Sequence, residues 1–166
     1  MKLRQGTTLK GGKYHIKKVL GQGGFGITYL ASQKIYVEGP IGQIEVEINL
    51  AIKEFFMKDI CNREEGCQTV SIPSTGSQKV AERFKQKFIK EARHISILQH
   101  PNIIKVVDVF EENDTAYYVM EYHSGGSLAD KVKNGPLAEA DAVRYIRQAA
   151  AALDYIHARQ ALHQDA

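Results

Sequence analysis

The spacing of hydrophobic residues changes several times along this 166-residue chain, and each spacing predicts a different element. Aromatic and β-branched residues at 14–20 and 27–32 flank a glycine-rich stretch, which is typical of a β-hairpin. After a turn at Gly39 and Pro40, residues 41–56 alternate between apolar and polar, which predicts a third strand. Its polar face includes Lys53, and its apolar face consists of Ile44, Val46, Ile48, Leu50 and Ile52.

Two more strands and three helices are predicted in the rest of the chain. The strands lie within 101–122, around a turn at Asn113 and Asp114. A long helix over about 77–98 places Val80, Phe84, Phe88, Ile95 and Leu98 on one face. A short helix begins at Ser127, whose hydroxyl can cap it, and a longer one covers about 138–158. Residues 57–76 show no period, which indicates an inserted surface loop.

The long helix carries one acidic residue in an unusual place. Glu91 falls in the middle of the apolar face, between Phe88 and Ile95. A buried carboxylate without a partner is costly, so the pattern predicts a lysine or arginine opposite Glu91.

Composition indicates an ordinary globular domain with one core, since 43% of the residues are hydrophobic and 25% are charged. The net charge is only +3, and the basic residues within 82–93 are too few to predict nucleic-acid binding. Cys61 and Cys67 match no common zinc or redox spacing, which favours free thiols over redox or metal sensing. No segment resembles a membrane span or a signal peptide, and we expect a cytoplasmic protein.

The stretch "VLGQGGFGITYLAS" at 19–32 contains four glycines within six residues. Each glycine costs about 0.5–1 kcal/mol of backbone order relative to alanine, so either a tight turn needs them or something lies against bare backbone. A dinucleotide-binding turn is one alternative, and Glu45 and Glu47 lie near the offset of its acidic residue. That turn opens a helix, however, whereas residues 27–30 have a strand composition.

Five elements follow one another along the chain: the glycines Gly21, Gly23 and Gly26, "LAIK" ending at Lys53, Glu91 in "FIKEARHISILQHPNII", "VMEYHSGGSL" and "ALHQD". In this order they resemble the protein kinase family. The resemblance extends from about Tyr14 onward, and "GQGGFGITYLA" looks most like the bacterial relatives of eukaryotic serine/threonine kinases. It implies an α+β fold, with an N-lobe of five antiparallel strands and the long helix over 1–122. A hinge and the helices that begin the C-lobe would follow over 123–166.

The resemblance also implies roles for particular residues. The glycine hairpin would lie over the triphosphate of ATP, and Lys53 would contact the α- and β-phosphates while an ion pair with Glu91 holds it. Asp165 would orient the substrate hydroxyl and accept its proton. Ser127 matches the ribose-contacting position, although it is equally placed to cap a helix with Asp130. The other implied nucleotide contacts are Gly21, Gln22, Gly23, Gly24, Phe25, Gly26, Thr28, Ala51, Met120, Glu121 and His123.

The sequence "HQD" departs from the family pattern, because Gln164 stands where the family usually has arginine. That arginine normally pairs with a phosphorylated activation loop, so control by such phosphorylation is in doubt. His163 is expected to pack beneath the catalytic loop. The protein ligands for Mg²⁺ are expected beyond Ala166, so we assign no metal ligand and expect negligible phosphotransfer by these residues alone.

Two functions follow from the sequence. The first is the N-terminal portion of an ATP-dependent protein kinase that transfers the γ-phosphate to serine or threonine hydroxyls of a protein substrate. The second is a catalytically incomplete or pseudokinase-like module that binds nucleotide weakly or not at all and acts by binding another protein. For the second, we hypothesise self-association or partial disorder at the 138–158 helix, whose apolar face needs a partner.

Overall fold

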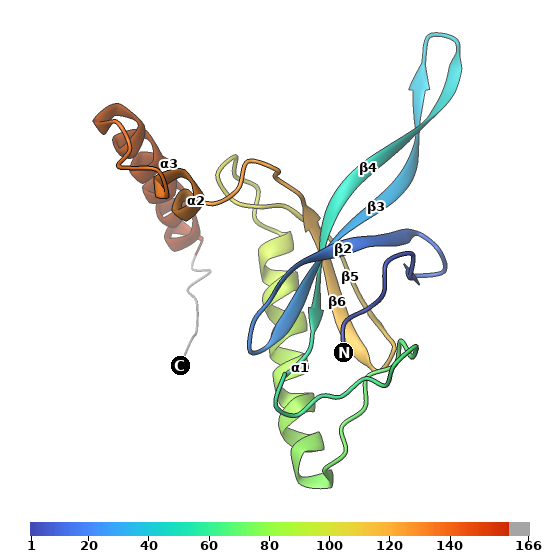
Figure 1. The fold of residues 1–166 in the computed structure, drawn as a ribbon. Coiled ribbons are helices and arrows are strands. Elements are labelled where there is room, and N and C mark those ends of the chain that lie inside the picture. The colour runs from blue at the N-terminus through green and yellow to red at the C-terminus, as the bar shows by residue number, and fades with distance from the viewer. Residues whose placement is uncertain (160–166) are drawn as a thin grey trace.

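The computed structural model describes residues 1–159 (Figure 1). Six antiparallel strands form one sheet in the order β1-β2-β3-β4-β6-β5. The strands are β1 (Thr8–Leu9), β2 (Tyr14–Gln22), β3 (Gly26–Gly39), β4 (Gly42–Phe55), β5 (Val106–Glu112) and β6 (Thr115–Glu121). The five predicted strands are all present. The two-residue β1 is additional, because two residues are too few to show a period.

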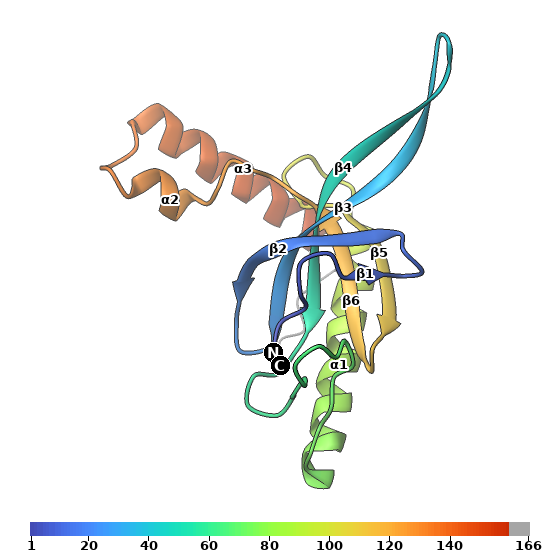
Figure 2. The same cartoon turned by 45° about the vertical axis from the view of Figure 1, so that its right-hand side comes forward.

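Three helices complete the fold, which confirms the predicted α+β class. They are α1 (Thr75–Ser96), α2 (Leu128–Val132) and α3 (Glu139–Ala158). Helix α1 packs against β5 and β6, while α2 and α3 lie to one side of the sheet (Figures 1 and 2). The Tyr155 hydroxyl of α3 accepts a hydrogen bond from the Gln99 N–H at 2.9 Å, so α3 is anchored to the chain after α1. The division into lobes at residue 122 remains a prediction.

The core contains aromatic side chains on the sheet face that α1 covers. The ring of Phe88 from α1 lies 5.7 Å from that of Phe55 and 4.9 Å from that of Tyr118. Large, rigid rings of this kind remove much apolar area from water and fix the distance between helix and sheet. They therefore determine which residues of α1 face β4.

The buried face of α1 differs from the predicted one. Its buried residues are Ala81, Phe88, Ile89 and Ala92, whereas Val80 is 43% exposed. At 100° per residue, Glu91 lies about 100° around the helix from the middle of this buried group. Glu91 is accordingly exposed, and the prediction that its carboxylate is buried is wrong.

The β3–β4 hairpin is much longer than the sheet that it joins. Beyond the pair Gln33 and Ile48, the two strands pair only with each other, and they project away from the rest of the molecule (Figure 1). The predicted alternation is present in β4, but only its second half is covered. Leu50 and Ile52 are buried, whereas Ile44 remains 49% exposed.

Residues 56–74, which we call the covering segment, connect β4 to α1. The segment has no helix or strand of its own, as predicted, but it is more than a surface loop. Cys61, Arg63 and Val70 are buried, and the Val70 N–H donates to the Asn113 carbonyl in the β5–β6 turn at 2.8 Å. The segment therefore wraps around the end of the sheet where β4 finishes (Figure 1).

Candidate nucleotide-binding site

The glycine hairpin joins β2 to β3, and the Gly23 N–H closes its turn on the Gly26 carbonyl at 2.9 Å. A Cβ at Gly26 would meet the Glu54 carbonyl oxygen at 2.7 Å, so the approach of β4 requires glycine there. A Cβ at Gly21, Gly23 or Gly24 would meet no described atom within 4 Å, and none of these residues has a positive φ. Neither packing nor backbone conformation within residues 1–159 therefore requires these three glycines.

The tip of the hairpin is held by the chain that follows β4. The Phe56 N–H donates to the Phe25 carbonyl, and the Lys58 N–H donates to the Gly24 carbonyl, both at 3.1 Å. The Phe25 ring is 57% exposed, and its centroid lies 5.4 Å from that of Phe84 on α1. The hairpin thus contacts both the covering segment and the helix.

Lys53 lies in β4, between Thr28 of β3 and Tyr118 of β6 in the register. Its Nζ is 5.6 Å from the ring centroid of Tyr118 and 6.0 Å from that of Phe88. Neither Lys53 nor Glu91 belongs to any of the salt bridges found in residues 1–159. The sequence prediction of a Lys53–Glu91 ion pair is therefore not met in this structure, because α1 turns Glu91 toward solvent.

The register brings several predicted residues together beside the glycine hairpin. Thr28 pairs with Lys53, and Ala51 pairs with Met120, so all four side chains leave the same face of the sheet. Ala51 is 5% exposed, which leaves a shallow, apolar wall next to the lysine. The roles of Thr28, Ala51 and Met120 in contacting an adenine ring remain predictions.

The remaining predicted residues fall at the end of β6 and beyond it. Glu121 ends β6, and the exposed His123 places its Nε2 3.8 Å from the Glu121 carboxylate. The Ser127 hydroxyl accepts the Asp130 N–H at 3.1 Å, and the Asp130 carboxylate accepts the Ser127 N–H at 2.8 Å. This capping box confirms the predicted helix start. Asp165, with His163 and Gln164, lies outside the described residues.

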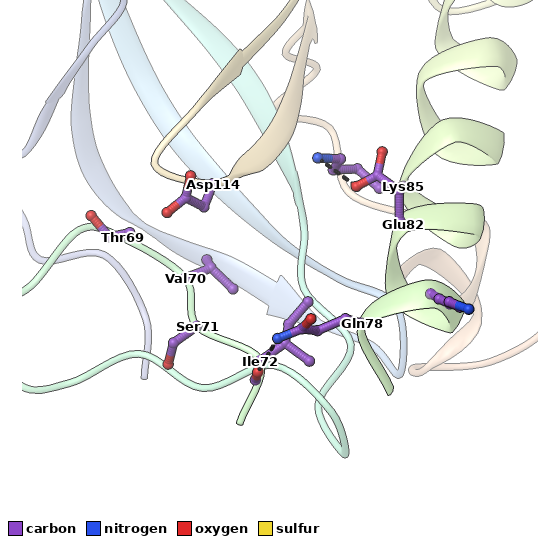
Figure 3. A pocket seen from close by; sticks show the side chains of 9 residues that line it. Thr69, Val70, Ser71, Ile72, Gln78, Glu82, Lys85 and Asp114 are labelled. Carbon is purple, nitrogen blue, oxygen red and sulfur yellow. Dashed lines mark hydrogen bonds and ion pairs between the residues drawn. The ribbon is translucent and has the colours of Figure 1, made fainter. Parts of the chain in front are cut away.

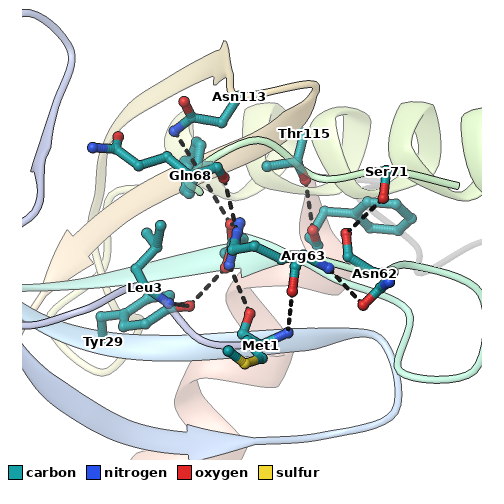
Figure 4. Close-up of polar contacts among 12 residues, drawn as sticks. Met1, Leu3, Tyr29, Asn62, Arg63, Gln68, Ser71, Asn113 and Thr115 are labelled. Carbon is teal, nitrogen blue, oxygen red and sulfur yellow. Dashed lines mark hydrogen bonds and ion pairs between the residues drawn. The ribbon is translucent and has the colours of Figure 1, made fainter. Parts of the chain in front are cut away.

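A buried ionic network, which sequence reasoning missed, lies on the opposite face of β4 (Figure 4). The Arg63 guanidinium donates to both oxygens of Glu54, through Nη1 at 3.2 Å and through Nη2. The hydroxyls of Tyr29 and Tyr117 donate to the same carboxylate at 2.7 and 2.9 Å. Burial and then the Glu54 charge raise the pKa of both tyrosines well above the ordinary value, so both stay protonated donors.

One signal in the sequence could have found this network. Glu54 continues the alternation of Leu50 and Ile52, so it falls in phase with the apolar face of β4. A buried carboxylate needs a cationic partner, and this expectation, made above for Glu91, holds for Glu54 because its side chain is buried. Its partner Arg63 has no such signal, because the covering segment has no period.

An open cavity of about 640 Å³ lies elsewhere, between the covering segment, the start of α1 and the β5–β6 turn (Figure 3). Its lining mixes both charge signs, since it includes Asp114 and the pair formed by Lys85 and Glu82, whose Nζ and carboxylate lie 2.9 Å apart. None of the predicted site residues lines it. The cavity therefore does not belong to the Lys53 face.

The two cysteines differ in burial. Cys61 is a buried free thiol, Cys67 is an exposed one, and burial raises the pKa of Cys61. No group of three or more His, Cys, Asp or Glu side chains within residues 1–159 could hold a metal ion. In the same part of the chain, no helix is both long and apolar enough to cross a membrane.

Comparison with known proteins identifies the family. Residues 59–166, more than half of the chain, match the family described as the protein kinase domain. The chain is 32% identical over 155 residues to the serine/threonine-protein kinase PrkC of Bacillus subtilis (strain 168), covering 93% of this chain and 19% of that protein. It is 31% identical over 160 residues to CBL-interacting protein kinase 12 of Oryza sativa subsp. japonica, covering 96% of this chain and 24% of that protein. The chain belongs to the protein kinase family.

Solved structures agree with this assignment. The structure titled "PpkA-294 apo form" matches with a TM-score of 0.66 and 25% identity, over 80% of this chain and 43% of that one. A mutant of the Mycobacterium tuberculosis PknI kinase domain matches in fold, with a TM-score of 0.64 and 22% identity, over 100% of this chain and 56% of that one. The chain thus spans about half the length of these structures and at most a quarter of the two relatives.

Proposed function

We propose that this chain provides the ATP-binding part of a serine/threonine protein kinase, which transfers the γ-phosphate of ATP to hydroxyls of a protein substrate. The observation that carries the proposal is the glycine hairpin beside Lys53. Gly21, Gly23 and Gly24 leave bare backbone facing open space, and the fold itself has no need of glycine there. A ligand that approaches the backbone closely supplies the missing reason.

Phosphate oxygens are the ligand groups that fit this backbone. The Gly23 N–H already donates to the Gly26 carbonyl, but other peptide N–H groups of the hairpin that no side chain shields can donate to phosphate oxygens, and a lysine ammonium can neutralise their charge. Lys53 is suited to this role because no carboxylate within residues 1–159 forms a salt bridge with it. The apolar wall formed by Thr28, Ala51 and Met120 would accept the adenine ring.

In this proposal the Lys53–Glu91 ion pair forms only when nucleotide is bound. Glu91 is exposed in the present structure, so α1 would have to rotate to bring its carboxylate toward β4. The contact between Phe25 and Phe84 offers a way for the hairpin to influence that rotation. Mg²⁺ would neutralise the phosphates in the complete kinase, but residues 1–159 offer no cluster that fits it, so we derive no step through the metal. Asp165 is proposed as the base for the substrate hydroxyl.

The test is calorimetric titration of ATP, with and without Mg²⁺, into the 166-residue chain and two lysine variants. We expect Lys53→Ala to abolish binding. Lys34→Ala removes an exposed lysine that pairs with Glu45 on the projecting hairpin, and it should bind as the unaltered chain does. Absence of binding by the unaltered chain, or equal binding by the Lys53→Ala variant, would overturn the proposal.

A second candidate function is a protein-interaction module, and one observation favours it. Helix α3 buries only Ala152 among the described residues, while Ile146 is 69% and Leu153 is 54% exposed. We propose that this apolar face pairs with a second copy when no other protein covers it. Sedimentation at several concentrations would test this, and a monomer at all of them would exclude self-association.

A further inference from the structure

We propose that Arg63 is a positioning residue for the nucleotide site, acting from the covering segment through Glu54 on Lys53 and the glycine hairpin. This inference rests on the proposed function, because it concerns how the ATP-binding residues are held. Within residues 1–159, no hydrogen bond or salt bridge joins Arg63 to Lys53 or to the glycine hairpin. Its influence depends on two mechanical links, one through β4 and one along the covering segment.

The first link is the position of Glu54 beside Lys53. Successive residues of a strand leave opposite faces, so the lysine faces the proposed nucleotide and the glutamate faces Arg63. Tyr29 and Tyr117, which also bind Glu54, belong to β3 and β6, the two strands that flank β4. The network therefore ties three strands together at the level of Lys53.

The second link runs from Arg63 back to the tip of the hairpin. The Met57 carbonyl accepts the N–H groups of Ile60 and Cys61 at 3.0 and 2.7 Å, which makes a tight turn. The residues on either side of Met57 donate to the hairpin, Phe56 to the Phe25 carbonyl and Lys58 to the Gly24 carbonyl. This turn ends close to Arg63 in the sequence. The ion pair of Arg63 with Glu54 and the hydrogen bonds of Phe56 and Lys58 to the hairpin are therefore made by one short stretch, residues 56–63.

Arg63 is itself held on several sides (Figure 4). Its Nε donates to the Gln68 carbonyl at 2.8 Å and its Nη1 to the Met1 carbonyl at 3.0 Å, in addition to both oxygens of Glu54. Side-chain exposure is 1% for Arg63 and 0% for Glu54. A side chain fixed in this way has one geometry, which is what a positioning role requires.

A purely structural ion pair would stabilise the whole fold without a particular effect on the hairpin. The double variant Glu54→Leu/Arg63→Met separates these roles, because apolar residues of similar size often replace a buried ion pair without loss of stability. Arg63→Lys, which keeps the charge but loses the bidentate contact, serves as a second variant if the double variant does not fold. Asp108→Asn is the matched control, since this carboxylate is bound by Lys10, Lys13 and Tyr14 at another part of the sheet.

The first measurement is amide hydrogen exchange at Phe56 and Lys58, relative to the slow amides of β6 that report global unfolding. We expect at least tenfold faster relative exchange in the double variant, a smaller increase in Arg63→Lys, and none in Asp108→Asn. Equal acceleration of all amides, or no change, would show that the pair is only structural and would overturn the inference.

The second measurement is ATP affinity by calorimetry in the same variants. We expect at least fivefold weaker binding by the double variant and unchanged binding by Asp108→Asn. Unchanged affinity in a double variant that is folded would overturn the inference. If the unaltered chain does not bind ATP, the proposed function fails instead, and the exchange measurement still decides whether Arg63 positions the hairpin.

Discussion

Replacing Arg63 with methionine alone should destabilise the protein strongly. The change leaves the Glu54 carboxylate fully buried, with two tyrosine hydroxyls as its remaining partners. Removing one member of a buried ion pair typically costs about 3–5 kcal/mol of unfolding free energy, because the other charge stays desolvated. That is a large part of the roughly 5–15 kcal/mol that separates most folded domains from unfolding.

Chemical denaturation would measure this loss. The Glu54→Leu/Arg63→Met double variant is the control, and it should lose less stability than Arg63→Met, because it leaves no buried charge without a partner and orphans only the neutral hydroxyls of Tyr29 and Tyr117. A loss below about 1 kcal/mol in Arg63→Met, a value typical of exposed pairs, would refute the assignment of a desolvated pair.

Three further predictions follow from individual contacts. Gly26→Ala should destabilise the fold by about 1–3 kcal/mol, because its Cβ would lie 2.7 Å from the Glu54 carbonyl, and thermal melts would show this. Gly24→Ala should change stability by less than about 0.5 kcal/mol, because its Cβ would meet no described atom within 4 Å, yet it should weaken ATP binding in calorimetry, because the proposed phosphates would lie against that backbone. Burial alone would raise the pKa of Asp108, but hydrogen bonds from two lysines and a tyrosine outweigh it and lower this pKa below 3.8. The ionised Asp108 therefore stabilises the fold, and this stabilisation is lost as pH falls through the lowered pKa. Acid titration of stability should show that loss in the unaltered protein and not in Asp108→Asn.

The sequence by itself was sufficient for the elements and for the glycine hairpin. Apolar spacing with period two or 3.6 reports which residues face inward, and this information is local. The turn residues Gly39 and Pro40 and the cap at Ser127 are local as well, and the structure has each of them where predicted. The order of motifs identified the kinase family for the same reason, since each motif is a short stretch of chain.

Tertiary structure decided the rotation of α1. Its apolar positions span a wide arc of the helix, and the prediction centred this arc on large residues such as Val80. The buried face instead consists of Ala81, Phe88, Ile89 and Ala92, which lies about 100° around the helix from Glu91 and leaves that side chain exposed. The spacing of apolar residues shows which side of a helix can be buried. The surface against which the helix packs decides which of those residues actually are buried.

Tertiary structure also decided which carboxylate is buried and what binds it. The alternation in β4 marks Glu54 as inward-facing, but no pattern in the aperiodic covering segment identifies Arg63 as its partner. That partner depends on the path of the segment around the end of the sheet, which long-range contacts such as the one between Val70 and Asn113 fix. Periodicity can therefore reveal that a charge is buried, while only the folded chain shows which residue neutralises it.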